Sequence, residues 1–170
     1  MGKVQNAFGC GAPGTVTRSV DNIVISLRNA SDGDIPFGAP VFLAGNGAVP
    51  FDISDPQDFA AFLGFAVRVA DKTPDVYPRG QFNTASSGGE TGAWHAGDVM
   101  EVLVRGSAAV AVNASGTTGG ALYIRKSDGV LTADAGSAGT TVALENVRIR
   151  GPRDGFSGCC EAVINKRNML

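Results

Sequence analysis

The residues from Gly97 to Ala114 read GDVMEVLVRGSAAVAVNA and alternate between apolar and small or polar side chains on both sides of Gly106. The apolar members of this alternation are Met100, Val102, Val104, Val110 and Val112. A period of two is typical of β-strands that bury one face. Glycine adopts backbone angles that other residues resist, so Gly106 predicts a bulge or a tight reversal, which we interpret as the turn of a hairpin.

The same pattern recurs along the rest of the chain. Short apolar or alternating runs occupy residues 22–28, 41–44, 65–69, 121–125, 142–150 and 161–165. Turns separate these runs, since the chain has 24 Gly and 8 Pro among its 170 residues. Gly45-Asn46-Gly47 is a hairpin signal, whereas Asp55 followed by proline indicates one short helical turn that reaches Phe62.

About nine or ten short strands at this spacing predict an all-β fold, an antiparallel β-sandwich or barrel of jelly-roll-like type. We expect residues 15–170 to form a single β-domain. Residues 1–14 are expected to form an extended N-terminal arm, because four of its last six residues are Gly or Pro. The predicted core comprises Ile23, Ile25, Leu27, Val67, Val69, Met100, Val102, Val104, Val110, Val112 and Ile149.

The charge and composition of the chain exclude several classes of partner. The 14 basic and 16 acidic residues give a net charge of −2 and form no dense Lys/Arg block, so we expect no direct contact with nucleic acid. No apolar run approaches the roughly 20 residues that span a membrane, and no signal peptide is evident. We therefore expect synthesis in a reducing cytoplasm. The low share of charged residues, 18%, suggests that partners cover part of the exterior.

Residues 9–14, GCGAPG, match the dinucleotide-binding pattern GxGxxG. That chemistry requires a buried strand before the glycines and a helix after them, because the helix N-terminus receives the pyrophosphate. Here the segment before the glycines is short and polar, and the following residues 15–27 are strand-like. We interpret the segment as part of the arm and expect no cofactor.

His95, the sole histidine, follows the sole tryptophan, Trp94. A Ser-His-Asp triad would have to combine His95 with an orienting carboxylate and a serine. The available residues are Asp71 or Asp98, and Ser86, Ser87 or Ser107. No GxSxG elbow presents any of these serines. We therefore interpret the pair as a partly buried aromatic cluster at the end of a loop, and we expect no enzymatic activity.

The three cysteines are Cys10, Cys159 and Cys160, an odd number with an adjacent pair. This is unlike the disulfide framework of a secreted domain. Together with His95 they could be considered as zinc ligands. Adjacent cysteines point in different directions, however, and the usual C-x₂₋₄-C spacing is missing. We interpret all three as structural thiols and expect no metal.

Four segments, in this order and spacing, resemble the cement, or head-decoration, proteins of tailed bacteriophages. Residues 35–41, IPFGAPV, are similar to an "fG-PV" segment of that family, and residues 62–68, FLGFAVR, to its "GvlvR" segment. The run GDVMEVLVRG at residues 97–106 is the most specific of the four. Residues 119–124, GGALYI, are similar to "G-xVYv". The Cys-Cys pair, the long arm and the Trp94–His95 loop depart from the pattern.

The resemblance implies a β-rich structural protein that binds the outer surface of a phage capsid and reinforces junctions between major capsid protein subunits. The low share of charged residues leaves apolar strand edges or faces exposed, so we also expect a homo-oligomer, a dimer or trimer on the capsid. Because the arm carries Val4 and Phe8 as its sizeable apolar side chains, these two residues are candidate capsid contacts, together with Trp94.

Two other functions stay open at this point. The first is a carbohydrate- or ligand-binding β-sandwich module, which would require an exposed aromatic platform. Trp94, Tyr77 and Tyr123 are the residues able to supply one. The second is a small hydrolase that uses His95.

Overall fold

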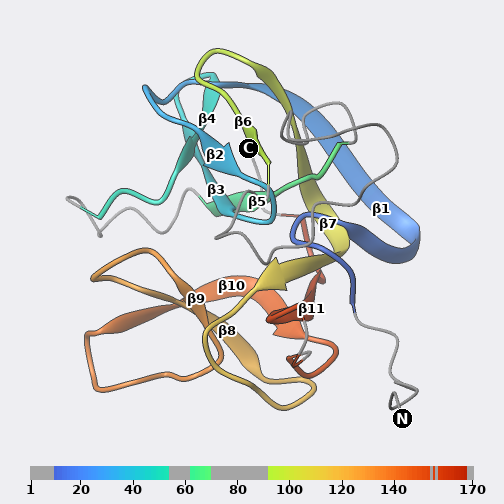
Figure 1. Ribbon diagram of the computed structural model, residues 1–170, viewed down its shortest axis with the longest axis vertical. Helices are drawn as coiled ribbons and strands as arrows, with labels where there is room; N and C mark the ends of the chain where they lie inside the picture. Colours follow the sequence, from blue (N-terminus) through green and yellow to red (C-terminus); the bar gives the residue numbers. More distant parts are fainter. Residues whose placement is uncertain (1–9, 54–61, 70–91, 154, 156, 168–170) are drawn as a thin grey trace, which may run out of the picture.

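The computed structural model describes residues 10–53, 62–69, 92–153, 155 and 157–167 (Figure 1). These residues form β1 (Val16–Asn29), β2 (Ile35–Pro36), β3 (Pro40–Ala44), β4 (Gly47–Pro50), β5 (Phe62–Ala66), β6 (Ala93–Trp94), β7 (Val99–Ala111), β8 (Ala121–Arg125), β9 (Leu131–Thr132), β10 (Thr141–Ile149) and β11 (Cys159–Ile164). Within these ranges no helix is long and apolar enough to cross a membrane. The predicted helical turn at residues 55–62 lies outside the described residues, except for Phe62, which begins β5.

Nine of the strands form one sheet in the order β1-β4-β3-β5-β7-β11-β10-β8-β9. Because β1 also pairs with β7, the first five strands of this order close into a ring, a small barrel. The β1–β4 contact is parallel, and the other pairings of the barrel are antiparallel. Strands β2 and β6 form a separate two-stranded sheet. The predicted all-β fold is thus confirmed, with an architecture that combines a barrel and a second layer.

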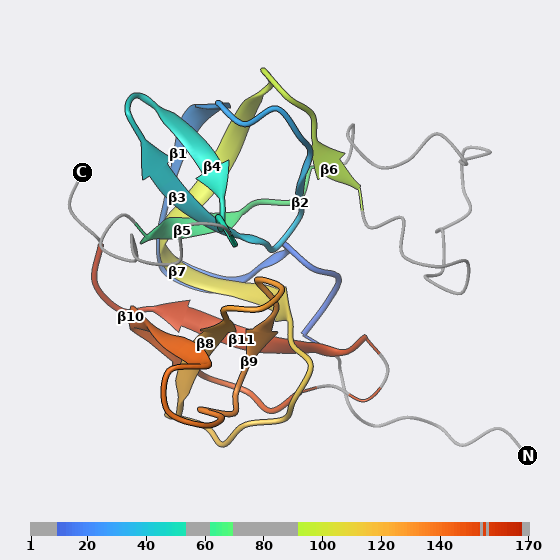
Figure 2. The same cartoon turned by 90° about the vertical axis from the view of Figure 1, so that its left-hand side faces the viewer.

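Strand β7 joins the two layers, which lie one above the other in Figure 2. Its first half pairs with β1 and β5 in the barrel, and its second half pairs with β11. Strands β8 to β11 form the second layer (Figure 1). A strand of 13 residues is long enough to serve both layers, so one continuous ladder fixes their relative position.

The prediction of a hairpin at Gly106 is wrong, because β7 continues through this residue without reversing. Gly106 has a φ of +116°. Residues 18–23 of β1 face only residues 105–107 of β7, so β1 bulges opposite the glycine. A Cβ atom at Gly106 would lie 1.9 Å from Oδ1 of Asn22 in that bulge. Glycine is therefore needed for a positive φ and a close approach.

The hairpin predicted at residues 45–47 is confirmed. Strands β3 and β4 pair antiparallel, with Ala44 opposite Gly47. The two intervening residues make the connection, and Gly45 has the positive φ, +57°, that such short turns require.

Three apolar clusters are present among the described residues, and the smallest consists of Val67, Leu103 and Ala108. The barrel encloses Ile35, Phe37, Val41, Ala48, Leu63, Ala66, Trp94, Met100, Val102 and Val104. The space between the barrel and the second layer holds Phe42, Phe62, Phe65, Val110, Val112, Leu122, Ile124, Leu131, Leu144, Val147, Ile149, Cys160, Ala162 and Ile164. Of the predicted core, Ile23, Ile25, Leu27 and Val69 are partly buried, and the other seven residues are buried.

We predict that Val102→Ala lowers the free energy of unfolding by about 1–3 kcal/mol, because it removes buried methyl groups and leaves a cavity inside the barrel. Val102 is fully buried, whereas Val99 on the same strand is 68% exposed. Val99→Ala is therefore the matched control and should change stability by less than about 0.5 kcal/mol. Urea denaturation measures both. Equal losses in the two variants would contradict the assigned register of β7.

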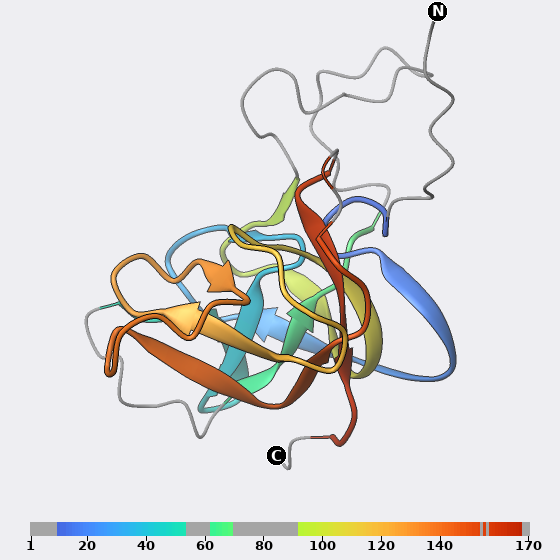
Figure 3. The same ribbon diagram turned by 90° about the horizontal axis from the view of Figure 1, so that it is seen from below.

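The end of the predicted N-terminal arm packs on the folded body. Gly14 is buried; its N–H donates to the carbonyl of Ala109 at 2.8 Å, and its carbonyl accepts from the N–H of Arg68 at 2.8 Å. A turn closed by the N–H of Thr15 and the carbonyl of Ala12, 3.1 Å apart, precedes β1. Figure 3 shows this N-terminal turn, in blue, beside the red chain of β11.

Candidate functional site

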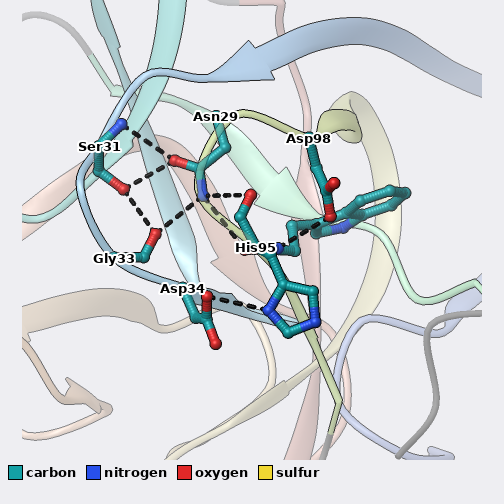
Figure 4. A network of polar contacts seen from close by, with 7 residues as sticks. Asn29, Ser31, Gly33, Asp34, His95 and Asp98 are labelled. Atoms are coloured by element: carbon teal, nitrogen blue, oxygen red, sulfur yellow. Dashed lines mark hydrogen bonds and ion pairs between the residues drawn. The ribbon is translucent and has the colours of Figure 1, made fainter.

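The predicted site residues Trp94 and His95 lie where β6 ends, at a corner beside the end of β1. Figure 4 shows His95 with the polar residues around it. Trp94 pairs with Ile35 of β2, and the residues that follow it run beside the end of β1. The N–H of Asn29 donates to the carbonyl of Asp98 at 2.7 Å, and the N–H of Gly97 donates back to the carbonyl of Asn29 at 3.0 Å. This corner therefore joins two segments that are distant in sequence, residues 29–35 and residues 94–98.

The side chain of Asn29 holds the corner together. It is 1% exposed, and its Nδ2 donates to three carbonyl oxygens, those of Gly33 at 2.9 Å, Trp94 at 3.1 Å and His95 at 3.1 Å. Its Oδ1 accepts from the hydroxyl of Ser31 at 2.7 Å and from the Ser31 N–H at 3.1 Å. A buried amide with both ends satisfied fixes the surrounding loops in one arrangement.

The His95 ring faces Asp34, which is not one of the two predicted orienting carboxylates. Its Nδ1 lies 3.0 Å from Oδ1 of Asp34, and both side chains are more than half exposed. Asp98 instead accepts from the backbone N–H of His95 at 3.0 Å and so stabilises the turn (Figure 4). Asp71, the other predicted partner, lies outside the described residues.

The serines proposed for a triad do not complete one in the part of the chain that the structure describes. Ser107 is buried in β7, where its hydroxyl accepts from the guanidinium of Arg150 at 3.3 Å. Ser86 and Ser87 lie outside the described residues. Among the described residues, the corner around His95 thus shows a solvent-exposed hydrogen bond between His95 and Asp34, and Ser107 is engaged elsewhere.

Trp94 belongs to the barrel core. Its side chain is buried, at 4% exposure, and its indole Nε1–H donates to the carbonyl of Val67 at 3.0 Å. Its ring packs edge-to-face on Phe37 with centroids 6.0 Å apart, and the guanidinium of Arg68 lies over the same Phe37 ring, 5.4 Å from its centroid. The ring therefore offers no aromatic platform, although it was one of three predicted candidates. Tyr123 is partly buried, and Tyr77 lies outside the described residues.

The described part of the GxGxxG pattern, residues 10–14, contains a turn, and β1 follows it. A dinucleotide site needs a helix after the glycines, whereas in the structure the strand β1 occupies this place. Gly14 is enclosed by backbone on three sides, since a Cβ atom there would lie 2.9 Å from backbone atoms of Gly38, Ala66 and Arg68. This glycine serves the packing of the N-terminal turn.

All three cysteines are present as thiols, and two of them are buried at the start of β11. The thiol of Cys10 hydrogen-bonds that of Cys159, and this contact, together with burial, raises the pKa of Cys159 well above its ordinary range. Burial, with a smaller contribution from Cys10, raises the pKa of Cys160 to about 12. Among the described residues no group of three or more His, Cys, Asp or Glu side chains is arranged to hold a metal ion.

These thiols predict a loss of stability at alkaline pH. The pKa of Cys160 is raised from 9.0 to about 12. The contribution of this protonated thiol to the free energy of unfolding is therefore fully present below pH 9 and is lost as the pH rises toward 12. In that window the folded state holds a proton that the unfolded state releases. We expect the free energy of unfolding to fall by about 1.4 kcal/mol per pH unit for each such thiol. Urea denaturation between pH 8 and 10.5 should show a shallower pH slope for Cys160→Ala than for the wild type; identical slopes would contradict this prediction.

Comparison with known proteins adds two findings. The family model described as "Structural cement protein (E217 gp24/Pam3 gp6)" matches residues 2–164. A chain in the solved structure titled "The capsid of Myoviridae Phage XM1" superposes with a TM-score of 0.69, covering 97% of this chain and 96% of that chain at 18% identity. At this identity the likeness shows a shared fold. No curated protein matches the chain.

Proposed function

The chain belongs to the phage structural cement protein family, and we propose that it binds the outer surface of an assembled capsid and reinforces junctions between major capsid protein subunits. The observation that carries this proposal is the extent of the family match, residues 2–164, which spans the arm, the barrel and the second layer. The coarser role, a structural protein of the phage capsid, follows from family membership. The outer location and the junctions are the proposal.

The fold supports a mechanical role. The closed barrel and the continuous strand β7 make a stiff body, because the nine-stranded sheet is a single hydrogen-bonded network. A stiff body that touches several capsid subunits gains from effective concentration, so each contact can be weak while attachment is strong. Such a protein requires no catalytic centre, cofactor or metal, and we propose that it has none.

Two candidate capsid-contact regions, Trp94 and the N-terminal segment, are both hydrogen-bonded to residues 67 and 68, which follow β5. The carbonyl of Val67 accepts from the indole of Trp94 at 3.0 Å. The N–H of the next residue, Arg68, donates to Gly14 at 2.8 Å, where the N-terminal turn ends. We propose that Trp94, whose ring is buried, supports attachment by fixing this segment, and that Val4 and Phe8 make the apolar contacts with the capsid.

Self-association belongs to the same proposal. The large apolar side chains exposed on the described surface are Val24, Ile53 and Val99, at 41%, 52% and 68%. This limited apolar area favours dimers or trimers that form on the capsid, where neighbouring copies are held close together, over oligomers in free solution.

The proposal is tested by adding the purified chain to capsids that were assembled without it. We expect saturable binding at a fixed ratio to the major capsid protein and a higher temperature of capsid rupture. Absence of binding, or binding without any gain in capsid stability, would overturn the proposal. His95→Ala should bind and stabilise capsids like the wild type. A hydrolytic activity that disappears in this variant while its fold is retained would establish the alternative of a hydrolase.

A further inference from the structure

The register of β7 brings the N-terminal turn and the start of β11 to the same end of one strand. β1 runs antiparallel to β7, with Val16 opposite Ala108, so residues before Val16 lie toward the end of β7. The hydrogen bond from Gly14 to Ala109 continues that direction. β11 also runs antiparallel to β7, and its first residue, Cys159, is opposite Ala111.

The side chains at this meeting point are two thiols. Cys10 is partly exposed and lies four residues before Gly14, and its thiol hydrogen-bonds that of the fully buried Cys159. The thiol of Cys159 also donates to the carbonyl of Ser157 at 3.6 Å, and this hydrogen bond holds the thiol at the start of β11. Cys160 packs in the cluster between the barrel and the second layer, and adjacent residues of a strand face opposite sides.

We propose that Cys10 and Cys159 form a disulfide latch, which ties the N-terminal segment to β11 once the protein leaves a reducing compartment. The inference depends on the thiol geometry and is independent of the proposed capsid function. Its consequence is a change in how residues 10–14 are attached: with two thiols these residues are held by hydrogen bonds, and with a disulfide they are held covalently.

The oxidant is a low-molecular-weight disulfide such as oxidised glutathione. The partly exposed Cys10 loses its proton to solvent, and its sulfur attacks one sulfur of the small disulfide and displaces the first small thiolate. The sulfur of Cys159, after losing its proton, then attacks the Cys10 sulfur of the mixed disulfide and displaces the second. Two thiol protons go to the two small thiols, and two electrons pass from the protein to the oxidant. Because the pKa of Cys159 is raised, Cys10 is the faster first nucleophile.

The test uses the purified full-length chain in buffers of reduced and oxidised glutathione, followed by alkylation of remaining thiols and non-reducing peptide mapping. Trypsin releases Cys10 in residues 4–18 and both other cysteines in residues 154–166. We expect these peptides to become cross-linked in a monomeric chain that is two hydrogen atoms lighter. The melting temperature should rise by about 5–10 °C relative to the reduced protein.

Three variants make the result specific. Cys10→Ser and Cys159→Ser should lose both the cross-link and the gain in melting temperature, whereas Cys160→Ala, the control, should retain both. Retention in Cys160→Ala also identifies Cys159 as the partner, since the two adjacent cysteines share a peptide. A cross-link that requires Cys160, a bond between two chains, or fully alkylated thiols after oxidation would each overturn the proposal.

Discussion

Gly64→Ala is expected to reduce the free energy of unfolding by about 3 kcal/mol or more, or to prevent folding. Gly64 lies in β5, where a Cβ atom would meet the carbonyl oxygen of Leu103 at 2.0 Å and its carbonyl carbon at 2.8 Å. These are backbone atoms of β7, so they cannot rotate away as a flexible side chain could. The substitution would force β5 away from the strand that both layers share.

Gly33→Ala is the matched control, because nothing lies within 4 Å of the Cβ position at Gly33. This residue lies in the exposed loop after β1, and the same change there should leave stability within about 0.5 kcal/mol of the wild type. Thermal and urea denaturation of the two variants give the comparison. A Gly64→Ala protein as stable as Gly33→Ala would show that β5 and β7 are not so closely apposed.

The position of Gly64 also explains how β7 can continue from the barrel into the second layer. The β5–β7 ladder pairs Phe65 with Leu103 and Ala66 with Val102. β7 then continues to Gly106, where its pairing with β11 begins. Without a side chain at residue 64, β5 can lie close over β7 at the point where β7 leaves the barrel. The two glycines, one in each strand, thus permit close contacts on either side of this transition.

Local periodicity predicted the strands well, because the two-residue alternation depends only on which face is buried. It could not distinguish a strand that continues through Gly106 from a strand that reverses there, since both outcomes place a glycine between two alternating runs. The bulge of β1 at residues 18–23 decides between the two outcomes. This bulge pairs with β7 around Gly106, although the two segments are more than 80 residues apart in sequence. Non-local pairing therefore overrides the local turn signal.

The corner around His95 shows the same limit. The sequence singles out Trp94 and His95 because they are rare residue types, but it does not single out Asn29. The amide of Asn29 reaches carbonyls that are 65 and 66 residues away, so no local spacing connects them. The available signal was a serine two residues after an asparagine, which is typical of a side-chain-closed turn. That pattern predicts a turn and says nothing about its distant partners.

The four segments that carry the family resemblance have a common structural basis. Residues 35–41 cover β2 and the start of β3, residues 62–68 cover β5, and residues 97–106 cover the first half of β7. All three contribute side chains to the barrel core, where volume and strand register restrict the choice of residue. The fourth segment, residues 119–124, leads into β8 of the second layer. Sequence resemblance at low identity thus follows the packed barrel, whereas the loops are free to differ.

Deleting residues 1–9 is expected to leave the melting temperature of the isolated protein nearly unchanged and to weaken attachment to capsids by at least about tenfold, equivalent to about 1.4 kcal/mol. The deletion ends before Cys10, because Gly14 is buried and Cys10 contacts Cys159. Burial of Val4 and Phe8 on a capsid would contribute about 1.5–3 kcal/mol each. Ordering the backbone opposes this by about 1–2 kcal/mol per residue, so main-chain hydrogen bonds to the capsid must supply the remainder.

A full-length chain with both Val4→Ser and Phe8→Ser separates side-chain burial from main-chain contacts, and Gln5→Ala with Asn6→Ala in the same segment is its control. At limiting concentration we expect capsid occupancy to decrease in the order control, double serine variant, deletion. Because all of these variants keep Cys10, the thiol pair is intact in each, and a change in occupancy is attributable to residues 1–9 alone. Equal occupancy of the deletion and the wild type would show that attachment is made by the barrel and the second layer, and that the arm has no part in it.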